Sequence, residues 1–210
     1  MTGRPKVRLL AAILALLFLA QGCAIRTGTT ITGTGDLSST PQGRTAVLRV
    51  TAYAKNDSKS GHVTWGVLDT PNPDQRFAEL LAYVAETEGG LSVIEPIRAI
   101  ERLEDAGLEP TLQPDDATLK RYAEALGCSS VLTADIRCWR HKYVFFSSSA
   151  IVEFTLTCRV PGEPDPLWGV RTCCSGRKMD NTEIAVHALK QTFRALKARH
   201  DVEGWCECPE

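Results

Sequence analysis

Two closely spaced pairs of cysteines are the residues of this chain best suited to chemistry. Among its eight cysteines, Cys173 and Cys174 are adjacent, and Cys206 and Cys208 are separated by one residue. Thiols at such spacing can form disulfides, bind a soft metal ion or act as a redox pair. The spacing differs from the C-x-x-C of zinc knuckles. These four residues therefore predict disulfides first, with a metal site and free thiols as alternatives.

No arrangement typical of an active site accompanies the cysteines. The four histidines are scattered, without the partner three or four residues away that would help to chelate a metal. Ser147 to Ser149 lack the glycines of a nucleophile elbow, and Gly89-Gly90 is not followed by the lysine of a phosphate loop. The carboxylate pair Asp115-Asp116 is better explained as a helix cap. We therefore predict a protein that is not an enzyme, with no catalytic residue, no metal and no cofactor apart from a covalent lipid.

A further cysteine, Cys23, follows a segment with the order of an export signal. Three basic residues near the start precede 12 consecutive apolar residues, Leu9–Ala20, and the small residue Gly22 stands directly before Cys23. An apolar helix of this length would be about 18 Å long, well short of the ~30 Å hydrocarbon core of a membrane. Residues 1–22 are therefore predicted to be a signal peptide and not a transmembrane anchor.

The residues Ala20-Gln-Gly-Cys23 resemble the lipobox of bacterial lipoproteins, although the usual pattern has leucine where this chain has Ala20. The resemblance implies cleavage between Gly22 and Cys23 and a lipid on Cys23 that attaches the protein to a membrane. Ala24 is not the aspartate that retains enteric lipoproteins at the inner membrane, so an outer-membrane protein facing the periplasm is favoured. The alternative is an ordinary cleaved signal peptide that happens to precede a cysteine.

The remainder of the chain is interpreted as a tether, one domain and a tail. Residues 23–43 carry the lipidated cysteine and are then rich in Thr, Ser and Gly, which predicts a flexible tether. Residues 44–200 have the length of a single periplasmic domain, and residues 201–210 form a tail that contains two cysteines. The formal net charge of −1, without a polybasic run, argues against nucleic-acid binding.

Hydrophobic periodicity predicts an α/β (α+β) domain in the order β-α-β-α-α-β-β-β-α. About five strands would form a mixed sheet covered by helices, and the last three strands alternate cleanly enough for an antiparallel meander. Cys138 and Cys158 fall on the apolar faces of two of these strands and are expected to be buried thiols. The predicted strands are 46–53, 91–94, 131–139, 150–160 and 167–174, and the predicted helices begin near Asp74, Ile97, Asp115 and Asp180.

Four large apolar residues cluster near the predicted turn between the first two strands of the meander. They are Trp139, Tyr143, Phe145 and Phe146. Such a cluster at a hairpin tip is typical of a contact with another subunit or with a membrane. The alternative is that these side chains fold back over the core.

Four stretches, in this order along the chain, resemble a family of envelope lipoproteins. They are Arg44–Val50, the helix-strand pair Phe77–Leu81 and Leu91–Glu95, the junction Ala123–Ala134, and the strand beginning Pro166–Gly169. The family comprises the curli-secretion-channel lipoproteins and their relatives. These relatives include a lipoprotein activator of a penicillin-binding protein, the Pel-export lipoprotein and the N-terminal domain of TolB. The loop 140–149 is too short for the long hairpins of the curli channel, so no transmembrane pore is expected.

The resemblance implies a non-enzymatic lipoprotein that acts through protein contacts in the assembly or export of surface material, with homo-oligomerisation into a ring as one expectation. Its envelope protein partner cannot be named. One alternative is a monomeric, tethered activator of a cell-wall synthase. A second is a thiol-redox or metal-handling envelope protein, which rests on the two cysteine pairs alone.

Overall fold

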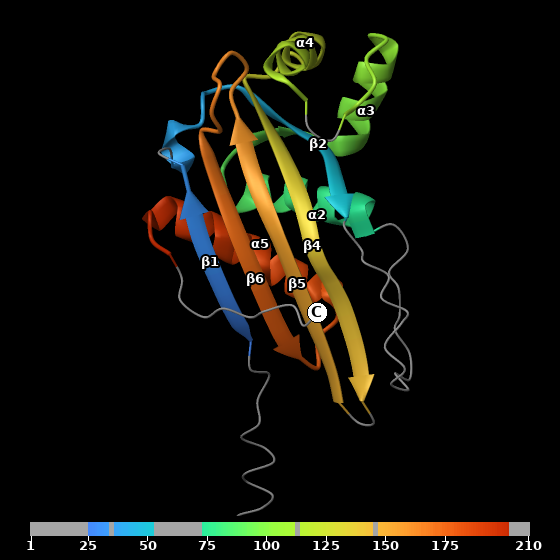
Figure 1. The fold of residues 1–210 in the computed structure, drawn as a ribbon, viewed down its shortest axis with the longest axis vertical. Coiled ribbons are helices and arrows are strands. Elements are labelled where there is room, and N and C mark those ends of the chain that lie inside the picture. Colours follow the sequence, from blue (N-terminus) through green and yellow to red (C-terminus); the bar gives the residue numbers. More distant parts are fainter. Residues whose placement is uncertain (1–24, 34–35, 53–72, 112–113, 145–146, 202–210) are drawn as a thin grey trace, which may run out of the picture.

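One mixed sheet of six strands organises the chain, in the order β1-β6-β5-β4-β2-β3 (Figure 1). The structure is a computed structural model that describes residues 25–33, 36–52, 73–111, 114–144 and 147–201. Within these ranges no helix has the length and apolar character needed to cross a membrane. The strands are β1 (Arg26–Thr32), β2 (Arg44–Ala52), β3 (Ser92–Ile94), β4 (Ser130–Val144), β5 (Ser147–Arg159) and β6 (Trp168–Arg177). The helices are the 3-10 turn η1 (Leu37–Ser39), α2 (Pro73–Thr87), α3 (Pro96–Asp105), α4 (Asp116–Leu126) and α5 (Asn181–Ala198).

All nine predicted elements are present in the predicted order, and the predicted fold class is confirmed. β4, β5 and β6 form the expected antiparallel meander, whereas β2 pairs in parallel with both β3 and β4. Parallel strands need a crossover connection, and helices provide it here: α2 joins β2 to β3, and α3 and α4 join β3 to β4. The sheet is mixed because β4, β5 and β6 are instead joined directly by short connections.

The prediction of a flexible tether over residues 23–43 is wrong for the part that forms β1 and η1. Residues Arg26–Thr32 pair antiparallel with β6 as an edge strand, which brings the sheet to six strands rather than five. Thr27, Thr29 and Ile31 alternate toward the helical side, and β-branched residues suit a strand whenever a neighbouring edge is available. The domain therefore begins well before residue 44.

Helices cover the two faces of the sheet unequally. α2 and α5 pack on one face, where they bury the larger core around Phe77, Phe154 and Phe193. In Figure 1 these two helices lie behind the sheet. α3 and α4 pack on the other face, only at the end formed by β2, β3 and the start of β4, over a smaller core that includes Leu48 and Val131. Much of the face formed by β1, β6, β5 and the rest of β4 therefore lies outside both helical layers; it is called the open face below.

Local sequence signals set the ends of the helices as expected. The Asp115 carboxylate accepts a hydrogen bond of 2.7 Å from the Thr118 N–H at the start of α4. Gly127 ends that helix in the left-handed conformation, at φ 61°, and the chain passes directly into β4. Asp180 and Glu183 form a reciprocal capping box at the start of α5.

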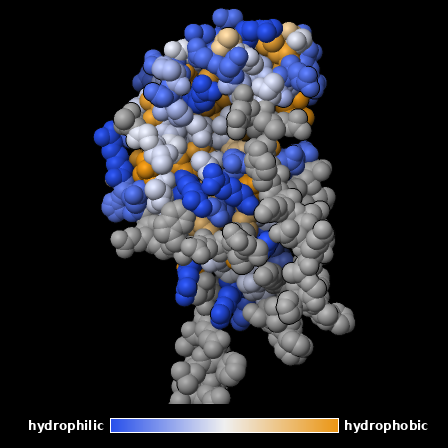
Figure 2. Space-filling model, in the orientation of Figure 1, coloured by the Kyte–Doolittle hydropathy of each residue, from blue (hydrophilic) through white to orange (hydrophobic). Residues whose placement is uncertain are grey.

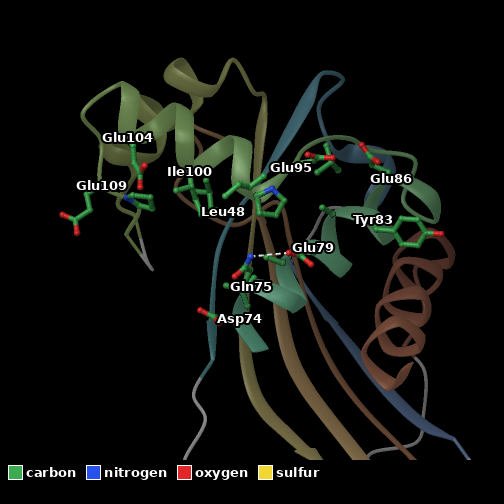
Figure 3. A pocket seen from close by; sticks show the side chains of 17 residues that line it. Leu48, Asp74, Gln75, Glu79, Tyr83, Glu86, Glu95, Ile100, Glu104 and Glu109 are labelled. Carbon is green, nitrogen blue, oxygen red and sulfur yellow. Dashed lines mark hydrogen bonds between the residues drawn. The ribbon is translucent and has the colours of Figure 1, made fainter. Parts of the chain in front are cut away.

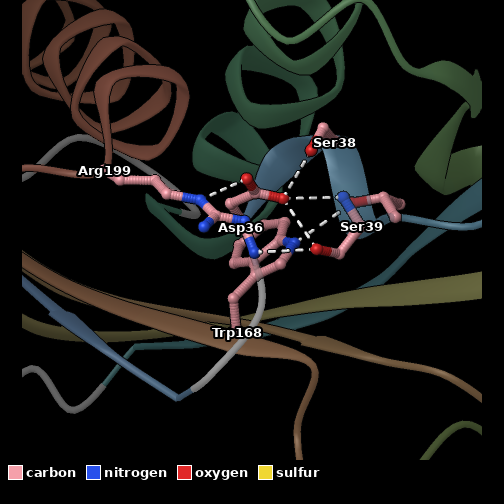
Figure 4. A network of polar contacts seen from close by, with 6 residues as sticks. Asp36, Ser38, Ser39, Trp168 and Arg199 are labelled. Carbon is pink, nitrogen blue, oxygen red and sulfur yellow. Dashed lines mark hydrogen bonds and ion pairs between the residues drawn. The ribbon is translucent and has the colours of Figure 1, made fainter.

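A polar network ties the segment after β1 to the end of α5 (Figure 4). Asp36 forms an ion pair with Arg199 and accepts hydrogen bonds from Ser38 and Ser39. The Arg199 guanidinium, helped by these serines, holds the pKa of the Asp36 carboxyl well below its ordinary value. Beside this network, the Trp168 indole N–H donates to the Thr40 hydroxyl at 3.1 Å. η1 is thereby held against both the sheet and α5.

The core around β5 yields a stability prediction. Phe154 is fully buried, and its ring centroid lies 4.8 Å from that of Phe77. Phe154→Ala is expected to lower the free energy of unfolding by about 3–5 kcal/mol, because it removes buried apolar contacts and leaves a cavity. Urea denaturation followed by circular dichroism measures this change.

The matched control is Tyr83→Ala, since Tyr83 is 57 % exposed. This change should alter the free energy of unfolding by no more than about 0.5 kcal/mol. Equal losses in the two variants would contradict the assignment of the core.

Candidate functional site

A groove of about 800 Å³ lies along the β3 edge of the sheet, between α2 and α3 (Figure 3). Its floor includes Leu48 and Val50 of β2 and Val93 of β3. One wall comes from α2 and the other from α3 and the segment that follows it. The wall residues are Asp74, Gln75, Ala78, Glu79, Ala82, Tyr83, Glu86, Glu95, Pro96, Ile97, Ile100, Glu104, Glu109 and Pro110.

The short length of β3 creates this groove. β3 pairs only with Arg44, Thr45 and Ala46, so no described strand continues along that side of β2. α2 and α3 pack on opposite faces of the sheet and border the edge from both sides. β2 shifts register between Val47 and Val50. As a result Leu48 packs on the α3 side of the sheet, and Val50 packs on the α2 side. An edge of this kind is a common surface for protein contacts.

The groove is strongly acidic. It is lined by six carboxylates and by no lysine or arginine. Arg76 forms an exposed ion pair with Glu79 at 3.2 Å but does not itself line the groove. In Figure 3 the carboxylates surround the apolar side chains of Leu48 and Ile100. Within the described ranges no three His, Cys, Asp or Glu side chains cluster as metal ligands would. The arrangement therefore suits a positively charged protein segment better than it suits a single ion.

Two exposed apolar residues stand on the walls. Tyr83 on α2 is 57 % exposed and Ile97 on α3 is 56 % exposed, and they are the large hydrophobic residues that the described part of the chain leaves exposed. Apolar side chains within an acidic groove are typical of a surface that binds another protein. The groove can accept an apolar side chain flanked by lysine or arginine.

Sequence reasoning did not find this groove, because its residues come from four separate elements. A signal was nevertheless present in α2. Asp74, Glu79, Tyr83 and Glu86 lie on the side of that helix opposite its apolar stripe, at spacings of three to five residues. This pattern indicates an exposed face with one aromatic residue, but only the position of α3 converts that face into a groove.

The predicted contact cluster at the hairpin tip is only partly described, and one of its members packs on the core. Trp139 is half-buried and packs on the larger core, with its ring edge-on to Phe77 at 6.2 Å. For Trp139 the structure therefore agrees with the alternative in which the side chain folds over the core. Tyr143 lies near the end of β4, and Phe145 and Phe146 lie outside the described residues.

The cysteine predictions are corrected at two positions. Cys173 is disulfide-bonded, whereas the adjacent Cys174, predicted as a disulfide candidate, is a free buried thiol. Successive side chains of a strand point to opposite faces, so Cys174 packs in the larger core and Cys173 lies on the open face. Cys138, expected to be a buried thiol, is also disulfide-bonded, and Cys158 is a free buried thiol as predicted.

The error at Cys138 and the inward position of Trp139 have one cause. β4 shifts register between Ile136 and Cys138, so strict alternation fails there. Cys138 therefore shares the open face with Glu153, and Trp139 turns toward the helices. The other predicted site residues, Gly22, Cys23, Cys206 and Cys208, lie outside the described residues.

The free thiols Cys158 and Cys174 favour the neutral form, which does not suit redox chemistry. Burial raises the pKa of Cys158 to about 12 and also raises the pKa of Cys174 above its ordinary value. A thiol is a poor nucleophile until it ionises. The pair Cys173-Cys174 therefore lacks the features of a redox site.

Comparison with known proteins identifies the fold. No protein-family model matches the chain, and no curated protein matches it. Among solved structures, a PelC dodecamer from Paraburkholderia phytofirmans is 15 % identical, with a TM-score of 0.54 over 80 % of this chain and 96 % of that chain. A variant of that PelC, also a dodecamer, is 16 % identical, with a TM-score of 0.50 over 84 % and 99 %. Lipoprotein GNA1162 from Neisseria meningitidis is 12 % identical, with a TM-score of 0.47 over 74 % and 98 %.

The similarity to PelC covers nearly the whole of that chain and at least 80 % of this one. It therefore confirms the resemblance to the Pel-export lipoproteins at the level of the fold: the chain has the fold of PelC.

Proposed function

We propose that this protein is a non-enzymatic, lipid-anchored protein of the bacterial envelope that assembles with copies of itself through the acidic groove. The lipid on Cys23 would hold the domain at the outer membrane, facing the periplasm. The assembly would then serve the export or construction of surface material. The observation that carries the proposal is an acidic groove with exposed apolar residues on one edge of a PelC-like sheet.

Self-assembly is supported by two observations. The similar PelC structures are dodecamers, so a fold of this kind is compatible with a closed ring. A ring needs two different surfaces on each subunit that fit one another. The groove on the β3 edge offers the first of these surfaces.

The opposite edge of the sheet offers the second. It carries exposed Arg26 on β1, and α5 ends beside this strand with exposed Lys197 and Arg199. Arg199 is ion-paired with Asp36, whereas Arg26 and Lys197 form no ion pair with another described residue. Because these two cations can face the carboxylates of the groove, the β1 edge of one copy is the proposed occupant of the groove of the next. Electrostatic complementarity of this kind fixes the register of an interface and raises its association rate.

The thiol-redox alternative is not favoured, because Cys173 and Cys174 are not bonded to each other and Cys174 is a buried thiol with a raised pKa. The tethered-activator alternative predicts a monomer. Native mass therefore separates it from the proposed ring.

Charge reversal in the groove tests the assembly. The lipoprotein is extracted in mild detergent, and its mass is measured by light scattering during size exclusion. We expect the native chain to form a closed oligomer and Glu79→Lys/Glu86→Lys to form monomers, because like charges would face each other across the interface. Adding Arg26→Glu/Lys197→Glu to this variant should restore the oligomer.

The control is Glu101→Lys, which changes an exposed carboxylate of α3 that does not line the groove. It should leave the oligomer unchanged. A native chain that is monomeric would exclude the ring and favour the tethered activator. An oligomer that survives the reversal at Glu79 and Glu86 would exclude the groove as its interface.

The lipid anchor is tested separately. Cys23→Ser should shift the protein from the membrane fraction to the soluble envelope fraction, because the acylated side chain is lost. Mass spectrometry of the N-terminal peptide should show acyl chains on the native chain only. Cys128→Ser, which changes a half-buried free thiol, serves as the control and should remain with the membrane. Retention of the Cys23→Ser protein in the membrane would contradict lipid anchoring.

A further inference from the structure

β1 is attached to the domain differently from the other strands that the structure describes. It lies at the outer edge of the sheet, where it pairs with β6 through seven residues and has no second described strand beside it (Figure 1). Among the described strands it alone contributes no side chain to the two buried apolar cores. Ile31 packs against the larger core but is only partly buried. A segment with so few buried apolar contacts is expected to have low local stability.

The side chains that β1 turns toward the helices are mainly hydroxyls. The Thr27 hydroxyl lies 3.2 Å from the Cys174 thiol, and the Thr172 hydroxyl donates to that of Thr29 at 3.4 Å. Thr172 is also hydrogen-bonded to the Thr192 hydroxyl of α5, at 2.7 Å. Removal of β1 therefore leaves Thr172 with a partner, which avoids the cost of an orphaned buried polar group. Figure 2 shows hydrophilic side chains over much of this side of the molecule.

The segment that follows β1 is, by contrast, firmly attached. Leu37 of η1 is buried in the larger core, and Asp36 is held by Arg199 and by the Ser39 N–H. Gly33 lies directly after β1 with φ 95°, a backbone conformation that favours glycine. The chain therefore has a glycine hinge at the end of β1 and a fixed point just beyond it.

We propose that β1 is a releasable strand that sets the length of the membrane anchor, an inference that rests on the proposed lipid at Cys23. With β1 docked, the three residues from Cys23 to Arg26 span at most about 11 Å. With β1 released and η1 still in place, the thirteen residues from Cys23 to Asp36 span at most about 47 Å. Release therefore lets the domain move away from the membrane while its core stays folded.

Anchor length and assembly are then coupled. The proposed ring uses the β1 edge, so it contains only docked β1 and holds each subunit close to the membrane. A single copy lacks this contact, and its β1 is able to leave β6. Because a partner that binds only the docked form lowers the population of the released form, assembly shortens the anchor. A ring and a tethered monomer would thus be two states of one protein.

Hydrogen exchange of the full mature lipoprotein in detergent measures the release. The amides of β1 are expected to exchange roughly 100-fold faster than those of β5, because β5 is paired on both sides and opens only when the domain unfolds. The same measurement on Glu79→Lys/Glu86→Lys removes the protection that a neighbouring copy would give to β1. Equal exchange rates in β1 and β5 of this variant would refute release.

A disulfide between β1 and β6 provides a matched test. Thr27 lies directly opposite the free thiol Cys174, so Thr27→Cys places two sulfurs where a disulfide can form. This staple should slow exchange in β1 by about tenfold or more, because the strand can no longer leave the sheet. The control Thr27→Cys/Cys174→Ser carries the same substitution without the partner thiol and should show no slowing. Unchanged exchange in the stapled protein, or covalent dimers that show β1 paired with another copy, would reject the proposal.

The gain in length is measured by pulling on single mature chains through handles at their two ends. Release of β1 frees ten residues, 26–35, so a first extension step of about 36 Å is expected before the sheet unfolds. The Thr27→Cys staple should abolish this step, and the Cys174→Ser control should retain it. A sheet that unfolds at once, without the first step, would overturn the proposal. Neither readout needs the lipid or the ring, so this proposal and the proposed function can fail independently.

Discussion

The pairing of β5 with β4 on one side and β6 on the other is the interaction on which the rest of the structure depends. These long antiparallel ladders place Phe154 and its alternating neighbours on one face, where α2 and α5 bury them. They also set the register that brings Cys138, Glu153 and Cys173 into one row on the other face. A change of register by one residue would exchange the two faces and lose both features.

Because β5 is paired along its length with β4 and β6, the unpaired strand backbones of the described sheet lie at its two outer edges. β3 is too short to protect β2, and the helices on either side leave an acidic groove there. At the other edge, Asp36 and Asp201 bind the end of α5 and the backbone of β1, so the N-terminal strand is held by polar contacts from outside the sheet. The two edges thus differ in shape and in the side chains that they present, which is the condition for head-to-tail assembly.

Local signals in the sequence predicted most of the fold, and long-range effects account for what they missed. Asp115 and Gly127 cap α4 through contacts within a few residues, so they could be recognised from the sequence. The segment of β1 has the composition of a flexible tether, and its strand forms only because β6 provides an edge. The register shift after Ile136 leaves no trace in the hydrophobic pattern, and it places Cys138 on the face opposite the one expected and turns Trp139 toward the helices. The groove combines residues of α2, α3, β2 and β3, whose proximity depends on the whole topology.

The most direct test of assembly through the groove is cross-linking in the native membrane. A photoreactive amino acid replaces exposed Ile97 at the groove wall, and the cross-linked product is identified by mass spectrometry. Assembly through the groove predicts a product of two copies of this chain, joined to a peptide at the end of α5 or on β1. A product with a different protein, or no product from correctly anchored chains, would contradict it.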